Sequence, residues 1–401
     1  MNSCYLCQAE AVAEVLDVGP QPIGNRFLTS PTTDDETLYP MVIGQCGACG
    51  LIQMMNPVPA HELLPPFDWI TYSEPEPHLD QMVETIINLP GVTADSKICG
   101  ISFKDDSTLA RFEKLGVKDT WRIDPKADLG ITHPGAGVEA IQEQLTPETA
   151  DSLVEKYGRS DVVIVRHILE HAHSAYQFVE ALKKLTTPRG YIVFEVPDCM
   201  QAIDKCDYTT LWEEHILYFT PETFKNSLTS SGFSMVYFEN YPYPFENSLI
   251  GIVQAQNDTT PVLPDKRVLA DEKRRADIFA KSLPEQRIKL KAFLSDYQQN
   301  KGKIALFGAG HLACTYICVL QLQDYVEFVV DDNPNKRGLY MPGSRLPIRG
   351  SAALVEENIK LCLLSLNPIS EDKVISNNQA FLENGGDFYS IFPASQRALK
   401  V

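Results

Sequence analysis

Asp161-Val-Val-Ile-Val165 is a run of four β-branched apolar residues behind an aspartate, and it decides the fold. A short apolar run without polar alternation is typical of a strand buried on both faces of a parallel sheet. Further strands are expected at Lys97–Ile101, Asp119–Ile123 and Tyr191–Val196, and helices at Thr108–Leu115 and Ala175–Leu185. Strands that alternate with helices predict a doubly wound α/β domain, which binds its ligands at the carboxyl ends of the strands.

A second domain of the same kind is predicted later in the chain. Lys303–Phe307 is typical of a strand, Gly308-Ala-Gly310-His-Leu-Ala313 of a tight turn into a helix, and Asp331 closes the next strand. This order matches the GxGxxA pattern with an acid about twenty residues later. The backbone N–H groups of such a turn, at a helix N-terminus, bind a diphosphate. The alternative is a Rossmann-like domain in which this turn is only structural.

Ten cysteines divide into two close pairs and six single residues. Each pair has the two-residue spacer that lets both thiolates of a turn bind one tetrahedral metal ion. A reducing compartment favours zinc over disulfide bonds. The sequence therefore predicts a zinc site with four ligands, Cys4, Cys7, Cys46 and Cys49. The alternative is a redox pair or a coincidence.

The predicted fold class is α/β, with two Rossmann-like doubly wound domains plus a small N-terminal zinc-binding module. The expected boundaries are 1–75 for the zinc module, 76–256 for the first Rossmann-like domain, 257–300 for a helical linker and 301–401 for the second. Four further elements are expected: a helix at His78–Leu89, an antiparallel edge strand at Ser248–Gln254, a charged helix at Asp265–Asp277 and an amphipathic helix at Gln286–Gln299.

Composition narrows the classes of function. The chain has 401 residues, of which 44% are hydrophobic and 22% charged, so two to three globular domains are expected. A net charge of −18 argues against general affinity for nucleic acid or for anionic membranes. The longest apolar runs are far shorter than the ~18 residues that would span a bilayer. No secretory signal is visible, so a cytoplasmic protein is expected.

Residues 207–224 have the character of an active-site loop. Thr220-Pro221-Glu222 is a helix start, with a capping hydroxyl, a proline at the first helical position and an acid facing the dipole; the helix is expected to end near Ser230. Just before it lie Glu213-Glu214-His215. An imidazole beside a carboxylate is suited to act as a general base, and His215 is the candidate. The alternative is a surface glutamate pair beside a half-buried histidine.

Arg166-His-Ile-Leu-Glu-His-Ala-His173 follows the central strand, so its polar groups are expected at the same carboxyl edge. His167 and His171 would share a helical face, but no glutamate stands where the HExxH metal pattern requires one. His171 is therefore expected to line the cleft, and His167 and His173 to be packing or surface residues. Asp124, at the end of an earlier strand, is expected to bind ribose hydroxyls; alternatively it forms the turn before Pro125.

The chain resembles the sugar C-methyltransferases of deoxysugar biosynthesis over essentially its whole length. The features that carry this resemblance are the two cysteine pairs with Gly50-Leu-Ile-Gln53, Asp124-Pro125, Glu195-Val-Pro197, Glu214-His215 with Tyr218-Phe219, and the run from Val330 to Ile348. The resemblance implies a zinc module, a class I S-adenosylmethionine domain and a C-terminal Rossmann-like domain around a nucleotide-linked ketosugar. It also implies that His215 is the base and that His171 and Glu214 line the site.

The sequence departs from this family in three places. Where the family has an acid and glycines for the methyl donor, this chain has Gly100-Ile-Ser-Phe-Lys-Asp-Asp-Ser107. The usual active-site tyrosine is Trp212, followed by Glu213, and His311-Leu312 stands where a lysine is frequent. The expected contacts to the donor are Gly100, Ser102, Asp105 and Asp124. The expected contacts to the substrate are Trp212, Gly308, Gly310, His311 and Asp331.

These features predict an S-adenosylmethionine-dependent C-methyltransferase. His215 would remove the proton beside a ketosugar carbonyl, and the resulting carbanion would take the methyl group. Two alternatives remain: an epimerase or ketose isomerase that uses the same proton abstraction without a methyl donor, and a non-catalytic binder of sugar nucleotides. The expected cofactors are zinc and S-adenosylmethionine, the expected partner is a nucleotide-linked sugar, and the expected state is a monomer or weak homodimer.

Overall fold

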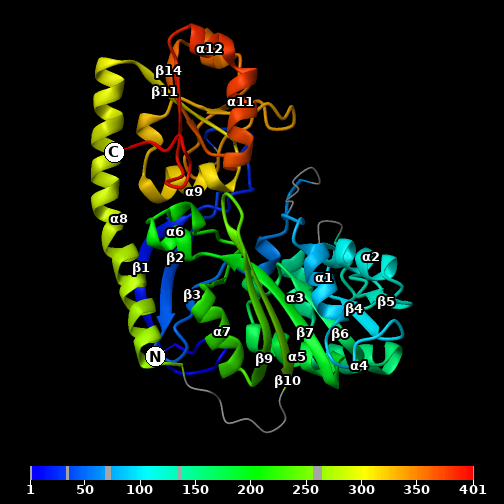
Figure 1. Ribbon diagram of the computed structural model, residues 1–401. Helices are drawn as coiled ribbons and strands as arrows, with labels where there is room; N and C mark the ends of the chain where they lie inside the picture. Colours follow the sequence, from blue (N-terminus) through cyan, green and yellow to red (C-terminus); the bar gives the residue numbers. More distant parts are fainter. Residues whose placement is uncertain (1, 33–35, 68–73, 134–136, 256–263, 401) are drawn as a thin grey trace. The chain divides into compact units, whose positions relative to one another are not determined.

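Figure 1 shows a computed structural model of the chain, which describes residues 2–32, 36–67, 74–133, 137–255 and 264–400. The residues fall into two compact units. Unit 1 comprises Met1–Glu14, Ile43–Met200 and Glu214–Lys273, and unit 2 comprises Val15–Val42, Gln201–Glu213 and Arg274–Val401. Each unit is therefore assembled from segments that are far apart in the sequence. The domain boundaries expected at residues 75, 256 and 300 stay a prediction.

Unit 1 contains a six-stranded sheet. Its strands, in spatial order, are β5 (Asp119–Arg122), β4 (Lys97–Gly100), β6 (Ser160–Arg166), β7 (Thr186–Asp198), β10 (Asn247–Ala255) and β9 (Phe233–Tyr241). The first four are parallel, and the last two are antiparallel to their neighbours. The sequence predicted β10 as the edge strand, which is wrong, because β9 lies outside it and pairs with it along its whole length.

Alternate residues of the central strands face two separate hydrophobic cores. Ile98, Val162 and Ile164 pack with α1 (Leu79–Ile87) and α2 (Asp106–Lys114) on one face. Their neighbours Cys99 and Val163 belong to the core on the other face. The helices that contribute to this second core are α3 (Val138–Gln144), α4 (Pro147–Tyr157), α5 (Ala175–Leu185) and α7 (Pro221–Ser230). Both faces are covered, as an all-apolar strand requires.

A four-stranded sheet is built mainly from the N-terminal residues. Its order is β1 (Val12–Gln21), β2 (Tyr39–Cys46), β3 (Ile52–Met54) and β8 (Leu217–Tyr218). The last strand comes from the predicted active-site loop, and it pairs antiparallel with β3 through Ile52 with Tyr218 and Gln53 with Leu217. The zinc-binding segment therefore holds one end of that loop by backbone hydrogen bonds.

Unit 2 contains a parallel five-stranded sheet, as predicted for a second Rossmann-like domain. Its order is β13 (Ile348–Arg349), β12 (Val329–Val330), β11 (Lys303–Phe307), β14 (Ile359–Leu364) and β15 (Asp387–Ser390). The helices of unit 2 include α9 (His311–Leu320), α10 (Ala353–Glu356), α11 (Glu371–Asn377) and α12 (Gln379–Glu383). Its core joins strand residues such as Phe307 and Cys362 to Leu354 and Phe381 on the helices.

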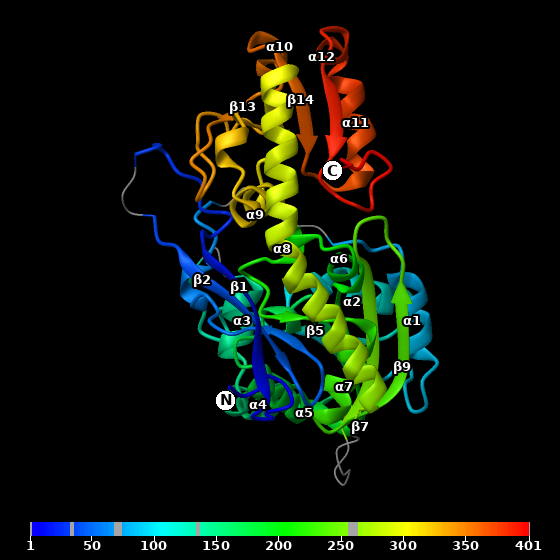
Figure 2. The same ribbon diagram turned by 90° about the vertical axis from the view of Figure 1, so that its left-hand side faces the viewer.

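The helical linker is one long helix rather than two. Helix α8 (Figure 2) runs from Lys266 to Asn300 without interruption. It contains Pro284. The sequence prediction of separate helices at Asp265–Asp277 and Gln286–Gln299 is therefore wrong in its division. Another helix, α6, is short (Met200–Asp204). Within the described ranges, no helix combines the length and the hydropathy needed to cross a membrane.

Candidate functional site

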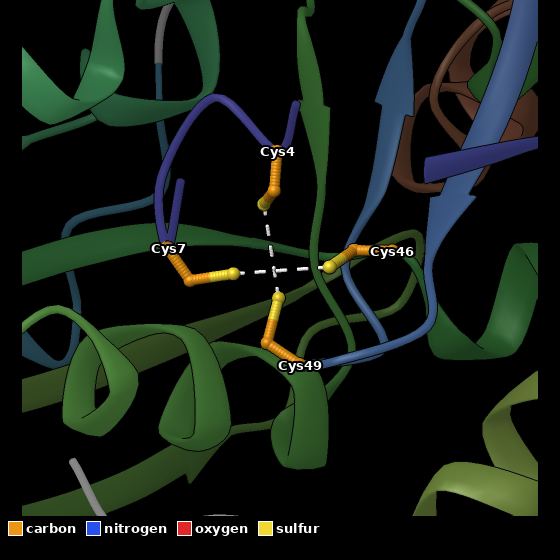
Figure 3. A group of neighbouring side chains, drawn as sticks. All are labelled: Cys4, Cys7, Cys46 and Cys49. Atoms are coloured by element: carbon orange, nitrogen blue, oxygen red, sulfur yellow. Dashed lines mark hydrogen bonds between the residues drawn. The ribbon is translucent and has the colours of Figure 1, made fainter. Parts of the chain in front are cut away.

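Four cysteine sulfurs converge within unit 1, two from the chain before β1 and two from the end of β2 and the turn after it (Figure 3). The Sγ atoms of Cys4 and Cys49 are 3.8 Å apart, and those of Cys7 and Cys46 are 3.7 Å apart. A tetrahedral zinc ion with Zn–S bonds of ≈ 2.3 Å requires S–S separations of about 3.8 Å. The four sulfurs therefore fit a zinc ion, as the sequence predicted.

Zinc would bind here as a structural ion. All four positions are occupied by protein sulfurs, so the site has no open position for a substrate. Hydrogen bonds among the four thiols lower the pKa of Cys7 and Cys46 and raise the pKa of Cys4 and Cys49, so before a metal binds the group favours thiolates at two of its four positions. The zinc ion would fix the segment that carries β2 and β3, and hence the strand β8 that pairs with β3.

Two histidines lie against each other at the carboxyl edge of the unit 1 sheet. His171 ends the 3-10 helix η3 (Leu169–His171), which follows β6, and His215 lies just before β8. Their ring centroids are 4.8 Å apart, and the rings are nearly perpendicular, at 88°. His171 is buried and His215 is half-buried. Two of the three residues that the sequence proposed as catalytic thus lie against each other, and the third, Glu214, lies beside His171.

Three glutamates complete a group that we call the histidine–glutamate cluster: Glu139, Glu170, His171, Glu214 and His215. Side-chain ligand atoms of Glu170, His171 and His215 all lie within 4.8 Å of one another, as do those of Glu139, His171 and Glu214. Nδ1 of His171 is 3.0 Å from Oε1 of Glu139. Burial would raise the pKa of Glu139, but its contact with His171 lowers the pKa below the usual value. An imidazole held in this way has a fixed orientation and tautomer.

Two members of the cluster are absent from the sequence prediction. Glu170 lies in the segment that follows the central strand, where the sequence predicted a role only for the histidines. Glu139 lies on α3 and carries no sequence signal, since only the packing of α3 beside η3 brings it to His171. His173, by contrast, contacts Gln142 and the carbonyl of Val58, which is the packing role expected for it.

Backbone hydrogen bonds position the loop that carries His215. The N–H of Ile216 donates to the carbonyl of Glu170 at 2.7 Å, which ties the loop to η3. On the other side, the predicted helix start is confirmed: Thr220 caps α7 by accepting the N–H of Thr223, and the Thr223 hydroxyl accepts the N–H of Thr220. His215 is therefore held between two rigid elements, η3 and α7.

The turn expected to bind the methyl donor follows β4 and contains the 3-10 helix η2 (Phe103–Asp105). Asp105 is fully buried, and its carboxylate accepts the N–H groups of Ile101 and Ser102 at 2.8 Å and that of Arg166 at 3.1 Å. A Cβ at Gly100 would lie 2.9 Å from Cβ of Asp105, so this glycine serves the packing of the turn itself. The turn does not fit the glycine cradle that the sequence resemblance implies for S-adenosylmethionine.

Asp124 stands exposed at the end of β5, where a ribose-binding carboxylate is expected. Its Oδ1 accepts the N–H groups of Lys126 and Ala127, which is the turn-forming role that the sequence left as the alternative. These bonds engage one of the two oxygens. The role of Asp124 toward a donor stays a prediction.

A buried network of ions lies beside the turn and extends to the histidine–glutamate cluster. Glu195 is completely buried and contacts Arg166, His78 at 3.0 Å and His167 at 3.1 Å. Nδ1 of His167 is 3.3 Å from Oε1 of Glu170, a member of the cluster. His167 is therefore part of a charged network rather than a simple packing or surface residue.

In unit 2, the predicted substrate residues Trp212 and His311 stack on each other. Their ring centroids are 4.1 Å apart and their planes differ by 14°. Glu213 is buried, and its Oε1 accepts the N–H of Gly24 at 2.5 Å. Burial raises the pKa of Glu213 to about 7. A Cβ at Gly24 would come within 3.2 Å of His311, so the absence of a side chain there allows this packing.

The predicted Gly308–Ala313 turn leads into α9, with Gly310 as its N-cap. Gly308 has a φ of 109°, and a Cβ there would meet the carbonyl of Ser365 at 3.1 Å, whereas a Cβ at Gly310 would meet nothing within 4 Å. Asp331 accepts the N–H of Ala309 at 3.1 Å and pairs with Lys336 at 2.9 Å. Asp331 thus supports the turn, and nucleotide binding by these residues stays a prediction.

Three families match successive parts of the chain. A zinc-binding domain matches residues 4–63, a methyltransferase domain matches residues 98–237, and a C-methyltransferase C-terminal domain matches residues 265–393. The chain is also similar to the C-methyltransferase NovU of Streptomyces niveus, with 22% identity over 408 residues, covering 98% of this chain and 96% of that protein. The likeness to NovU therefore extends through all three matched regions.

Similar solved structures include two methyltransferases. An O-methyltransferase family protein from Burkholderia thailandensis is 15% identical with a TM-score of 0.30, covering 44% of this chain and 56% of that one. Magnesium protoporphyrin IX methyltransferase from Synechocystis PCC 6803 is 17% identical with a TM-score of 0.29, covering 44% and 82%. These scores are too low to bear on fold or function. The three domain matches and the near full-length relative carry the assignment, and on them the chain is an S-adenosylmethionine-dependent C-methyltransferase with a zinc-binding domain, a methyltransferase domain and a C-methyltransferase C-terminal domain.

Proposed function

We propose that this protein transfers a methyl group to the carbon beside the carbonyl of a nucleotide-linked ketosugar, with His215 as the general base. The observation that carries the proposal is the contact of half-buried His215 with buried His171 at the carboxyl edge of the methyltransferase sheet. Ligands of such sheets bind at this edge. A base must reach both its substrate and, for turnover, the solvent, and the partial exposure of His215 suits both needs.

The protein's own residues supply the proton chemistry. His215 takes the proton from the carbon, and the electrons of the C–H bond form the enolate of the ketone. His171, held by Glu139, and the buried Glu214 orient the base and the ring of the substrate. S-Adenosylmethionine, when bound, supplies the methyl group. The donor turn has no glycine cradle for S-adenosylmethionine, so the steps proposed are those of the protein's own residues.

The nucleotide part of the substrate rests on the family resemblance and on the GxGxxA turn at Gly308. Trp212, Gly310, His311 and Asp331 remain the proposed contacts. A cytoplasmic location, the absence of nucleic-acid binding and a monomeric or weakly dimeric state also stay predictions.

One observation favours a second candidate function. The donor turn carries Lys104 and Asp105 in place of glycines, and the Asp105 carboxylate already accepts two of its N–H groups. The same proton abstraction without a methyl donor would make the protein an epimerase or isomerase of a nucleotide ketosugar. Both functions require His215 as the base, and they differ in the fate of the enolate.

Hydrogen exchange tests the base that both functions share. The ketosugar nucleotide is incubated with the protein in deuterated water without donor, and deuterium incorporation beside the carbonyl is followed by NMR. We expect exchange by the wild type, and a loss of about 10²–10⁴-fold in His215→Asn, which keeps much of the shape but cannot take the proton. His61→Asn, at an exposed histidine, is the control and should exchange like the wild type.

Addition of S-adenosylmethionine then identifies the reaction. A methylated product supports the transferase, whereas exchange with inversion and no methylated product would replace it by the isomerase. If the wild type and His215→Asn bind the nucleotide sugar equally and neither exchanges the proton, His215 is not a base.

A further inference from the structure

Lys104 occupies the donor turn with a side chain that is turned away from solvent. It lies in η2, directly after β4, and its side chain is only 12% exposed. Nζ of Lys104 is 2.6 Å from Oε1 of Glu74, whose side chain is 29% exposed. Lysine side chains normally keep the ammonium in water, so a buried one needs a strong partner. Glu74 is that partner.

Both members of the pair are charged. Burial would lower the pKa of Lys104, but the attraction of Glu74 outweighs this and raises the pKa above its usual value. Burial would likewise raise the pKa of Glu74, but His167 and Lys104 together lower it to about 2. At neutral pH the turn therefore contains a complete ion pair, held within hydrogen-bond distance.

The backbone around Lys104 is also engaged. The Lys104 carbonyl accepts a hydrogen bond from the Arg166 guanidinium at 2.5 Å, and its N–H donates to the Ser102 hydroxyl at 3.2 Å. Because Asp105 accepts the N–H groups of Ile101 and Ser102, the turn is closed by its own side chains. Movement of the Lys104 side chain would open space here by breaking its pair with Glu74, and it would leave the backbone hydrogen bonds of the turn in place.

S-Adenosylmethionine carries a sulfonium and an ammonium group against one carboxylate, so its net charge is positive. At the carboxyl end of β4 such a donor would meet the Lys104 ammonium, which repels it, and the Glu74 carboxylate, which would attract it if Lys104 were absent. A side chain with a four-carbon stem also fills space that a glycine leaves to a ligand. Charge and volume therefore act in the same direction.

We propose that Lys104 competes with the methyl donor for Glu74. The Lys104 ammonium occupies the place beside Glu74 that the cationic donor would take. The donor then binds tightly only when the Lys104–Glu74 pair is broken. This inference rests on the proposed methyl transfer and adds to it a residue that sets donor affinity.

Calorimetric titration of the full-length protein with S-adenosylmethionine tests this inference. Lys104→Ala, which removes charge and volume, and Lys104→Met, which removes the charge alone, are each expected to bind the donor at least tenfold more tightly than the wild type. Lys104→Arg keeps the charge and should stay as weak as the wild type. Lys114→Ala, at an exposed residue of α2, changes the net charge equally and should have no effect.

The outcomes separate this inference from the proposed function. Equal affinity of the wild type, Lys104→Ala and Lys104→Met would overturn the competitor role and leave methyl transfer in place. If no variant binds the donor at millimolar concentration, both the competitor role and methyl transfer fail. Lys104→Ala leaves Glu74 without this partner and therefore could fail to fold. In that case the double variant Glu74→Gln/Lys104→Met, which removes both charges, is compared with Glu74→Gln alone. The double variant must then bind the donor more tightly.

Discussion

His167 has a carboxylate on each side of its ring. Nδ1 lies 3.3 Å from Oε1 of Glu170, and Nε2 lies 3.1 Å from Oε1 of Glu195. A neutral imidazole has one N–H group, so it can donate to both carboxylates only when it is protonated. Burial alone would lower its pKa, but Glu74 and Glu195 raise it to about 10. His167 is therefore a fixed positive charge inside unit 1 at neutral pH.

This charge predicts how stability depends on pH. The pKa is about 10 in the folded protein and near 6.5 in the unfolded chain, so the folded state binds the proton more strongly. The stabilisation from His167 is complete below pH 6.5 and is lost as the pH rises from 6.5 to 10. We expect His167→Gln to flatten this part of the curve when the free energy of unfolding is measured by urea titration at a series of pH values.

His61→Gln is the control for the pH experiment, because His61 is exposed. It should keep the slope of the wild type. A wild-type slope in His167→Gln as well would show that His167 does not carry the extra proton.

The contact between His171 and His215 could be predicted from the sequence, but most of the surrounding network could not. Both histidines follow strands or loops whose ends meet at one edge of a parallel sheet, so the order of elements places them together. Glu139 and Glu74 reach the site from helix α3 and from the segment before α1, and no local pattern reports such a contact. A turn without glycines was visible in the sequence, but the closing role of Asp105 depends on side-chain direction.

Pro284 lies inside α8 at an exposed position. A proline in a helix interior removes one backbone hydrogen bond and crowds the preceding turn, at a cost of ~3 kcal/mol. Because the side chain is exposed, its removal costs little packing. We expect Pro284→Ala to raise the free energy of unfolding by roughly 1–3 kcal/mol, seen as a higher midpoint in thermal unfolding.

Lys281→Ala, one turn earlier and also exposed, should change the midpoint far less. A lower midpoint for Pro284→Ala than for the wild type would mean that the protein depends on a bend which the proline provides.

Elements with strong local signals were predicted with nearly their observed bounds. Helix α5 spans Ala175–Leu185 as predicted, and α7 begins at Pro221 behind its threonine cap and ends at Ser230. Strand β9 (Phe233–Tyr241) was missed, because most of its residues are half-buried and its sequence lacks a regular apolar alternation. The division of α8 into two helices followed from local polarity, which does not report whether a helix continues.

The zinc site predicts a property of the whole protein. Purified protein should contain one zinc ion per chain, measured by plasma mass spectrometry. Cys46→Ser should lose it, because three thiolates do not complete the tetrahedral shell. The loss should expose the segment that holds β2 and β3 to limited proteolysis, since the metal joins residues 4–7 to residues 46–49.

Cys206→Ser provides the matched control, because Cys206 is half-buried and lies outside the four-sulfur group. It should keep its zinc and its resistance to protease. Protein prepared without chelator that contains no zinc would contradict the assignment of the site.

Strands β1 and β2 and helix α8 each pass from one compact unit into the other. Neither unit can therefore be released as a fragment by cutting the chain once. The segment Val15–Val42 emerges early from the ribosome, but its unit is complete only when Arg274–Val401 has been made. Contacts that span such a separation form slowly and leave partner surfaces uncovered in the meantime. During synthesis the N-terminal segment of unit 2 is therefore exposed to aggregation until the last part of the chain has been translated.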